Sequence, residues 1–191
     1  MKSKTIPTPQ AIQAEIDRVK HQRDYIRTFK STFCMILFLI AVVVLISALI
    51  FPVFRTYGDD MAPTLKDGQL VCALRTTNVK PGDIICFYYN NKVLIKRVVA
   101  VSGEAVNIDW NGNVSVNDKV IDEPYLKSKS FGDCNISLPC QVPQSKIFVM
   151  GDNRSTSVDS RHTEVGFISQ EQIIGKLILR IWPLNAISTI K

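Results

Sequence analysis

The apolar residues of this chain follow two different patterns, and the change between them falls near residue 55. From Phe33 to Phe54 about 22 residues pass without a charge, and the run is rich in Val, Ile and Leu. A helix of about 20 apolar residues crosses the roughly 30 Å hydrocarbon core of a bilayer. The pattern therefore predicts a transmembrane helix at residues 33–54. Because the run follows about thirty residues of more polar chain, it is typical of an uncleaved anchor.

Basic residues mark the N-terminal side of this predicted span. Lys20, Arg23, Arg27 and Lys30 precede it, whereas only Arg55 follows closely behind it. The positive-inside rule then predicts a single-pass protein of the cell membrane with a cytoplasmic N-terminus. The domain after the span is expected outside the cytoplasm.

The N-terminal segment itself has apolar residues at helical spacing among its charges, which predicts a weakly amphipathic helix from about Pro9 to Thr32. The apolar positions are Ile12, Ile16, Val19 and Ile26. We favour a solvated cytoplasmic extension over a helix that binds a partner or the membrane surface. The chain is thus divided into residues 1–32, the span at 33–54 and a domain at 55–191.

After residue 55 the pattern changes to short β-branched and aromatic runs broken by Gly, Pro and Asn, which predicts a mostly β, antiparallel, barrel-like domain. Asn111-Gly112-Asn113 is expected to close a hairpin. Gln170–Ile174 is expected to form one helical turn capped by Ser169. The predicted strands are Gln69–Leu74, Ile84–Tyr89, Val93–Val101, Ala105–Ile108, Val114–Val116, Ile147–Met150 and Gly175–Trp182.

Composition excludes several classes of function. The 23 basic and 17 acidic residues leave a net charge of +6, but the cations are scattered and no basic patch is interleaved with aromatic residues. We therefore expect no nucleic-acid partner. Only two histidines are present and no Cys-x-x-Cys occurs, so neither a metal site nor a cofactor is expected.

The five cysteines differ in their surroundings. Cys34 lies in the predicted span and is interpreted as a small apolar residue. Cys134 and Cys140 bracket a short polar loop in a compartment that permits oxidation, and a disulfide and two free thiols are equally expected there. Cys72 and Cys86 are placed on adjacent strands, where buried thiols are at least as plausible as a bond.

Five short blocks follow the apolar segment in a fixed order, and together they resemble the type I signal peptidases, which are membrane-anchored serine endopeptidases with a lysine general base. The similarity covers about Tyr57 to Asn185. It implies a β domain with an apolar, membrane-facing surface and cleavage of exported preproteins. The blocks are Asp60-Met-Ala-Pro-Thr-Leu65, Pro81-Gly-Asp-Ile-Ile-Cys-Phe87, Ile95-Lys-Arg-Val-Val-Ala-Val-Ser-Gly-Glu104, Gly151-Asp-Asn-Arg-Ser-Thr-Ser-Val-Asp-Ser-Arg161 and Arg180-Ile-Trp-Pro-Leu-Asn185.

The resemblance assigns roles to residues of these blocks. It implies that Lys96 is the general base and that Ser157 orients it. The position of the nucleophilic serine, directly before Met-x-Pro-Thr-Leu, holds Asp60. The other implied residues are Gly58, Met61 and Ile95 for substrate binding, and Asp152, Asp159 and Arg161 for structure. With glycine at position 58, a backbone amide would have to stabilise the oxyanion.

Asp60 changes the expected chemistry. A carboxylate has no proton to give up at neutral pH, and one within about 4 Å of Lys96 favours the ammonium by roughly 4 kcal/mol at an effective dielectric constant near 20. The dyad should then be an ion pair. Adjacent Asp59 would face away if the stretch is extended, which argues against an aspartic-protease pair. Thr64 and Ser102 do not stand where the motif places the nucleophile.

Three functions stay open on the sequence alone. The preferred one is a pseudoenzyme, a non-cleaving factor that binds exported preproteins or pilin subunits at the membrane. The resemblance extends to family members with aspartate at the nucleophile position, which assist pilus assembly in Gram-positive bacteria. The second is an active signal peptidase that processes signal peptides during protein secretion. The third is an anchored structural domain without a functional cleft.

Overall fold

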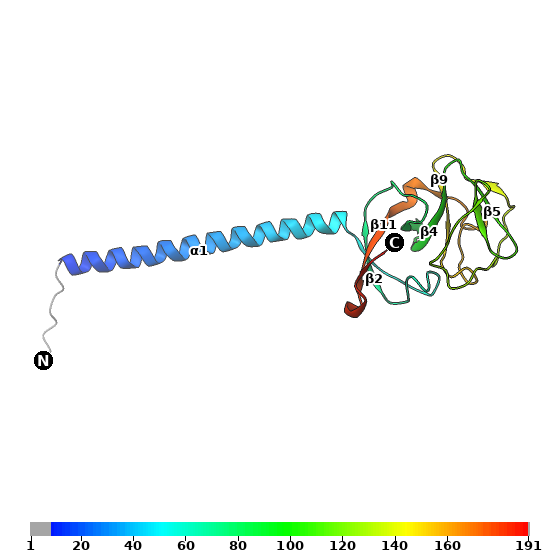
Figure 1. Ribbon diagram of the computed structural model, residues 1–191. Coiled ribbons are helices and arrows are strands. Elements are labelled where there is room, and N and C mark those ends of the chain that lie inside the picture. The colour runs from blue at the N-terminus through cyan, green and yellow to red at the C-terminus, as the bar shows by residue number, and fades with distance from the viewer. Residues whose placement is uncertain (1–8, 191) are drawn as a thin grey trace. The chain divides into compact units, whose positions relative to one another are not determined.

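The computed structural model describes residues 9–190, which form two units that meet at Ser47 and Ala48. The first unit is helical: α1 runs without a break over Pro9–Ile50 (Figure 1). The helix predicted for residues 9–32 and most of the predicted span therefore belong to one element. The side chains of Ile12 and Ile16, on which the amphipathic pattern partly rests, lie outside the described part.

Within residues 9–190, the stretch Asp17–Ile50 of α1 is long and apolar enough to cross a membrane, with a mean hydropathy of 3.3 in its most apolar window. No charged side chain occurs after Lys30 in this helix. The helix ends at Ile50, and two residues separate it from Val53, where the first strand begins. The boundary predicted at Phe54 thus falls inside the β unit, because the apolar run continues without a break from the helix into that strand.

The second unit is mostly antiparallel β-structure, as predicted, arranged in an eight-stranded and a four-stranded sheet. Every strand pair in it is antiparallel. The elements are β1 (Val53–Arg55), β2 (Leu70–Leu74), β3 (Ile84–Tyr89), β4 (Lys92–Val101), β5 (Ala105–Ile108), β6 (Val114–Val116), β7 (Lys119–Val120), β8 (Cys140–Gln141), β9 (Lys146–Met150), β10 (Ile168–Ser169), η1 (Gln170–Gln172), β11 (Ile173–Trp182), η2 (Leu184–Ala186) and β12 (Ser188–Thr189).

The large sheet has the order β1-β2-β11-β3-β4-β9-β10, with β12 added to β11. The short β3–β4 hairpin closes at Asn90 and Asn91, which both have positive φ, the requirement of a two-residue turn of this kind. β1 is an edge strand. β9 pairs with β4 only from Arg97 onward, so the first half of β4 is paired on one side alone.

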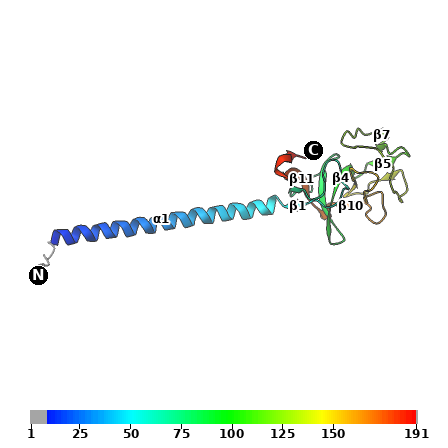
Figure 2. The ribbon, with the colours of Figure 1, turned by 90° about the horizontal axis from the view of Figure 1, so that it is seen from below.

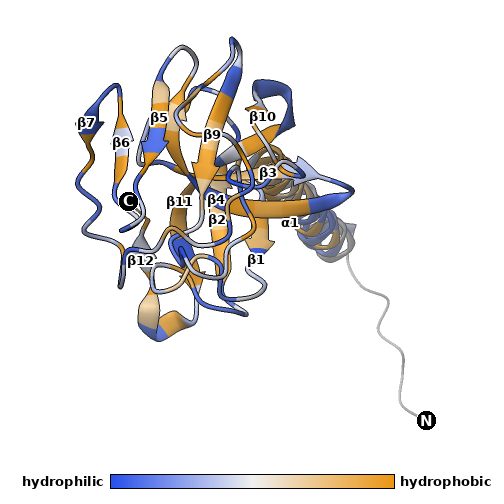
Figure 3. Cartoon of the chain, turned by 90° about the vertical axis from the view of Figure 1, so that its right-hand side faces the viewer, coloured by the Kyte–Doolittle hydropathy of each residue, from blue (hydrophilic) through white to orange (hydrophobic). Residues whose placement is uncertain are grey.

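The small sheet, β7-β6-β5-β8, lies beyond β4 in both ribbon views (Figures 1 and 2). A buried apolar cluster joins it to the large sheet through Val106 and Val114 on one side and Ala100 and Phe148 on the other. Two further buried clusters pack on opposite faces of the large sheet. One surrounds Met61 and Leu177, and the other surrounds Phe87 of β3 and Val149 of β9. Hydrophobic residues accordingly follow its strands, and polar ones the loops (Figure 3).

The predicted strands are present, with boundaries within two residues of those expected. The Asn111–Asn113 hairpin is also confirmed, because β5 pairs with β6 around it. The helical turn after Ser169 is shorter than expected: η1 ends at Gln172, and Ile173 and Ile174 already belong to β11. The prediction that Ile173 and Ile174 belong to the turn was wrong. Both side chains are buried, and both residues extend β11.

Cys72 and Cys86 are not on adjacent strands, since β11 lies between β2 and β3. All five cysteines are free thiols. Burial raises the pKa of the Cys86 thiol to about 12, and its Sγ donates to the Gly175 carbonyl at 3.3 Å. Burial, and secondly the neighbouring Cys134, raise the pKa of Cys140. Of the two alternatives that were equally expected for Cys134 and Cys140, the structure has the free thiols.

Candidate functional site

Three residues that are far apart in the sequence meet at the amine of Lys96. Its Nζ lies 2.6 Å from Oδ2 of Asp60 and 2.7 Å from Oγ of Ser157. Lys96 comes from β4, Asp60 from the loop between β1 and β2, and Ser157 from the loop after β9. The Lys96 side chain is 1% exposed, whereas the Asp60 side chain is 43% exposed. The amine is therefore enclosed by the fold, and the carboxylate is half in solvent.

The Asp60 loop is a series of turns, not the extended segment considered above, and it is fixed at several points. Within it, the Leu65 amide donates to the Met61 carbonyl at 2.8 Å. The Asn153 amide donates to the Asp60 carbonyl at 2.9 Å. The Thr64 hydroxyl donates to Asp152. The backbone of Asp60 is thereby held against the loop that carries Ser157.

Asp152 also receives a two-point ion pair from Arg97, with Nε and Nη2 each 2.8 Å from its carboxylate oxygens. Arg97 follows Lys96 directly on β4, so its side chain points to the opposite face of the strand. The ring of Tyr125 lies over the Arg97 guanidinium at 3.8 Å. The lysine and the loop opposite it are thus held in place from both faces of β4.

Glycine is required at position 151 by the closeness of two partners. A Cβ atom there would lie 2.1 Å from Oγ of Ser157 and 2.6 Å from the carbonyl oxygen of Asp60. Such distances are far below van der Waals contact. The absence of a side chain at Gly151 lets the Ser157 loop approach both Lys96 and Asp60.

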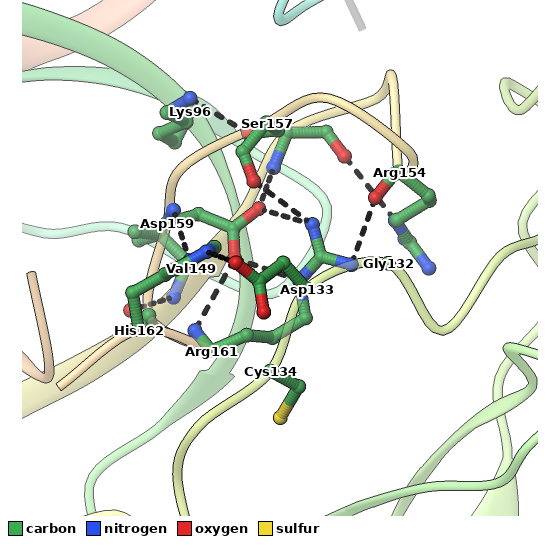
Figure 4. Close-up of polar contacts among 12 residues, drawn as sticks. Lys96, Gly132, Asp133, Cys134, Val149, Arg154, Ser157, Asp159, Arg161 and His162 are labelled. Atoms are coloured by element: carbon green, nitrogen blue, oxygen red, sulfur yellow. Dashed lines mark hydrogen bonds and ion pairs between the residues drawn. The ribbon is translucent and has the colours of Figure 1, made fainter.

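Behind Ser157 lies the fully buried ion pair of Asp159 and Arg161 (Figure 4). Nε and Nη2 of Arg161 each donate to one Asp159 oxygen at 2.8 Å, and the Gly151 amide adds a third hydrogen bond at 3.0 Å. Arg161 also donates to the Ser157 carbonyl at 3.2 Å. Burial pushes the pKa of Asp159 upward, but the Arg161 contacts outweigh it, and the pKa is lowered overall.

A groove of about 550 Å³ includes Asp60 and Lys96 in its lining. The other lining residues come from β1, the loop that follows it and the first half of β4. Three cations, Arg55, Lys92 and Lys96, line it together with one carboxylate, Asp60, and with several apolar side chains. The remaining lining residues are Val53, Phe54, Thr56, Tyr57, Gly58, Met61, Leu65, Val93, Leu94 and Ile95.

The predicted site residues fall into two groups in the structure. Asp60, Lys96, Gly58, Met61 and Ile95 line the groove. Ser157 contacts Lys96 from behind, and the remaining three, Asp152, Asp159 and Arg161, are buried supports. Gly58 has a φ of +74°, and its amide donates to Asp67 Oδ1 at 2.9 Å. That amide is therefore directed to a carboxylate of its own loop.

Sequence reasoning missed several residues of the site. Phe54, Tyr57 and Leu94 line the groove. They had no distinct local signal, because Phe54 and Leu94 stand beside other apolar residues in strands and Tyr57 lies in the loop after β1. The buried pair of Glu123 and Arg154, which supports the same loop, had no local signal because its partners are 31 residues apart. In the described part of the chain no cluster of three His, Cys, Asp or Glu residues could hold a metal ion.

This geometry can be compared with known proteins. The family model described as "Signal peptidase, peptidase S26" matches residues 28–182, which is most of the chain. The chain belongs to the type I signal peptidase family. This assignment implies preprotein substrates at the membrane, and α1 is consistent with the single-pass anchor of such a protein.

Curated signal peptidases are similar over most of their length. Signal peptidase I of Bacillus caldolyticus is 34% identical over 162 residues, covering 76% of this chain and 87% of that protein. Signal peptidase I U of Bacillus subtilis strain 168 is 33% identical, covering 75% and 86%. A crystal structure of a signal peptidase I from Enterococcus faecalis V583 is 28% identical with a TM-score of 0.46, covering 52% of this chain and 97% of that one.

Proposed function

We propose that this signal peptidase family member binds segments of secreted or pilin-type precursors in its groove and does not cleave them. The observation that carries the proposal is the 2.6 Å contact between Asp60 and Lys96. It supports the sequence-based assignment of Asp60 to the nucleophile position and of Lys96 to the base position. The dyad is then an ion pair in the lining of a peptide-sized groove.

The ion pair opposes peptide hydrolysis for two reasons. Carboxylate oxygens only accept hydrogen bonds, so the Lys96 amine acts as the donor to Asp60. A carboxylate beside the amine favours its charged ammonium form, and an ammonium has no lone pair with which to take the proton of an attacking hydroxyl. The carboxylate, in turn, brings no hydroxyl of its own for the amine to activate.

Other hydroxyls are poorly placed to replace the nucleophile. Ser157 touches Lys96, but it is only 3% exposed and lies behind the amine, away from the groove lining. The Thr64 hydroxyl donates to Asp152 instead. The contact between Lys96 and Ser157 is nevertheless the observation that favours the second candidate, an active signal peptidase.

The groove suits an extended peptide. β1 is an edge strand and the first half of β4 lacks a partner on one side, so backbone groups of both strands are available to an added strand. Binding by strand addition takes its affinity from the main chain and its selectivity from side-chain pockets. The apolar lining around Met61 and Ile95 is such a pocket.

The setting proposed for this activity is the outer face of the cell membrane. α1 would serve as the anchor, with Lys20, Arg23, Arg27 and Lys30 on the cytoplasmic side. The β unit would then meet exported preproteins, or pilin subunits of a Gram-positive cell, as they leave the membrane. It would hold them during assembly without consuming them.

Replacing the carboxylate by an alcohol tests the proposal. The full chain in detergent micelles is incubated with a preprotein that carries an Ala-x-Ala cleavage site, beside Asp60→Ser and Asp60→Ala. We expect cleavage by Asp60→Ser only, because serine supplies the hydroxyl and removes the partner of Lys96. Cleavage by the wild type that disappears in Asp60→Ala would refute the proposal and establish the second candidate.

Binding requires its own measurement. The same preprotein, labelled with a fluorophore, is titrated with wild-type protein and with Met61→Trp, which adds bulk at a residue that lines the groove and packs in the cluster around Leu177. We expect binding by the wild type and a loss of at least tenfold in the variant. Absent binding in the wild type would favour the structural-domain hypothesis, and equal binding by both proteins would show that the groove around Met61 is not the binding site.

A further inference from the structure

The two oxygens of the Asp60 carboxylate have different surroundings. Oδ2 receives the hydrogen bond from Lys96. Oδ1 has no hydrogen-bond partner among residues 9–190, and the side chain is 43% exposed and lines the groove. The groove lining therefore includes a charged acceptor that a ligand can reach.

An acceptor at this position selects the group that a ligand can bring there. A carbonyl oxygen placed against a carboxylate is repelled, whereas an N–H or O–H donor forms a strong charge-assisted hydrogen bond. The nearby Gly58 amide is already directed to Asp67. This part of the groove is therefore suited to a donor and unsuited to the carbonyl of a peptide about to be cut.

The charges of the groove decide what kind of donor fits. Arg55, Lys92 and Lys96 line it with only one carboxylate, which Lys96 already holds at 2.6 Å. A ligand ammonium would share that carboxylate with Lys96, and two cations a few ångströms apart repel each other. A neutral donor avoids this repulsion. Arg55 and Lys92, both exposed, instead attract an acidic side chain.

We propose that the groove takes an extended apolar peptide with an acidic flank, and that a backbone N–H of this peptide donates to Asp60 Oδ1. This inference rests on the proposed peptide-binding function and defines its ligand class. N–H and C=O groups alternate along an extended chain. The bound register therefore differs from one that places a peptide carbonyl against residue 60, and side-chain preferences should differ accordingly.

N-methylation of single amides tests the donor. The probes are acetylated, amidated ten-residue peptides of Leu, Val and Ala with one terminal Glu, each methylated at a different backbone nitrogen, and they are titrated into the full chain in detergent micelles. Strand addition uses several backbone amides, so methylation is expected to weaken binding at several positions in the wild type. At one of them, the amide that faces Asp60, we expect a loss of at least tenfold that depends on the carboxylate. In Asp60→Ala the same methyl group should weaken binding less than threefold.

The comparison with Asp60→Ala separates the lost hydrogen bond from the bulk of the methyl group, which acts in both proteins. Asp60→Asn, which keeps an acceptor oxygen without the charge, should give an intermediate loss and guards against misfolding of the alanine variant. If the wild type binds the parent peptide but every methyl group weakens binding equally in the wild type and in Asp60→Ala, the donor inference is overturned and the proposed function survives. If the parent peptide does not bind at all, both are overturned.

Exchange of the terminal residue tests the charge selectivity. Peptides that end in Glu, Gln or Lys should bind in decreasing order, and Lys92→Glu should reduce or reverse that order. Lys119→Glu is the matched control, because Lys119 is an exposed cation outside the groove lining. A Lys peptide that binds as well as the Glu peptide would contradict the acidic-flank part of the inference.

Discussion

Two ion pairs of the β unit lie on either side of Ser157 and are built differently. In the pair of Asp159 and Arg161 both side chains are fully buried, both carboxylate oxygens are occupied, and the guanidinium also donates to three backbone carbonyls. In the pair of Asp60 and Lys96 only the lysine is buried. Its carboxylate keeps one oxygen toward the groove.

The difference shows which pair stabilises the fold and which one meets a ligand. A buried pair with every polar atom satisfied fixes the loops around it, and loss of one partner leaves an uncompensated charge. A half-exposed carboxylate is screened by water, so its contribution to stability is small. We expect substitutions at Arg161 to act mainly on stability, and substitutions at Asp60 to act mainly on binding with a smaller loss of stability.

The largest effect is expected for Arg161→Ala. It leaves Asp159 charged and buried, and removal of one partner from a buried pair destabilises by about 3–5 kcal/mol. Tryptophan fluorescence during urea unfolding measures this, since both tryptophans, Trp110 and Trp182, lie in the β unit. Arg75→Ala, at an exposed arginine, is the control and should change stability little. A similar small change in both variants would show that the buried pair is dispensable.

Acidification acts on the same pair from the side of Asp159. Its pKa is lowered in the folded state, whereas an unfolded Asp titrates near 3.9. The contribution of Asp159 to the free energy of unfolding is therefore complete above about pH 4 and is lost as the pH falls through the lowered pKa of the folded state. Unfolding free energies between pH 7 and 3 should fall less steeply below pH 4 in Asp159→Asn than in the wild type. Asp118→Asn, at an exposed turn, should retain the wild-type slope.

The elements that bury a regular apolar pattern could be predicted from the sequence. β3 is an almost continuous β-branched and aromatic run that ends at Asn90-Asn91, and β4, which is rich in Val and Ile, begins directly after that turn, so pattern and turn chemistry agree. Strands of two or three residues, such as β8, β10 and β12, have no such pattern and exist only through pairing with a longer neighbour. The end of α1 at Ile50 could not be predicted either, because the apolar residues continue without a break to Phe54.

A residue of the candidate site was predictable where a short sequence block identifies its position. Asp60, Lys96 and Ser157 were placed by their blocks, and the structure brings them together. The contact between Thr64 and Asp152, 88 residues apart, could not be predicted, because it depends on how two loops pack. The separation of Cys72 from Cys86 by β11 has the same origin: strand order is a property of the whole fold.

An intermediate effect is expected for Gly151→Ala, which acts on both sides of the comparison. The added methyl group overlaps Ser157 Oγ and the Asp60 carbonyl, and overpacking of this kind destabilises by about 1–3 kcal/mol. It should also displace Ser157 from Lys96 and lower peptide affinity. Gly103→Ala is the control for backbone strain. Gly103 has a φ of +85° and open space around it, so its substitution strains the backbone without a clash, whereas Gly151→Ala creates a clash. Unchanged peptide affinity in Gly151→Ala would show that the Ser157 loop does not shape the groove.

The smallest change in stability is expected at the groove pair, and it should be unequal between the partners. Lys96→Met removes the buried cation and leaves Asp60 half in water, so the unfolding free energy should change by about 1 kcal/mol or less. Asp60→Ala leaves the Lys96 ammonium buried with Ser157 as its remaining partner, which should destabilise more than Lys96→Met does. Urea unfolding of both variants and of the double variant measures the asymmetry. Equal losses of unfolding free energy at Asp60 and Lys96, each as large as that of Arg161→Ala, would show that this ion pair is structural. The distinction between the two ion pairs, on which the binding hypothesis rests, would then be lost.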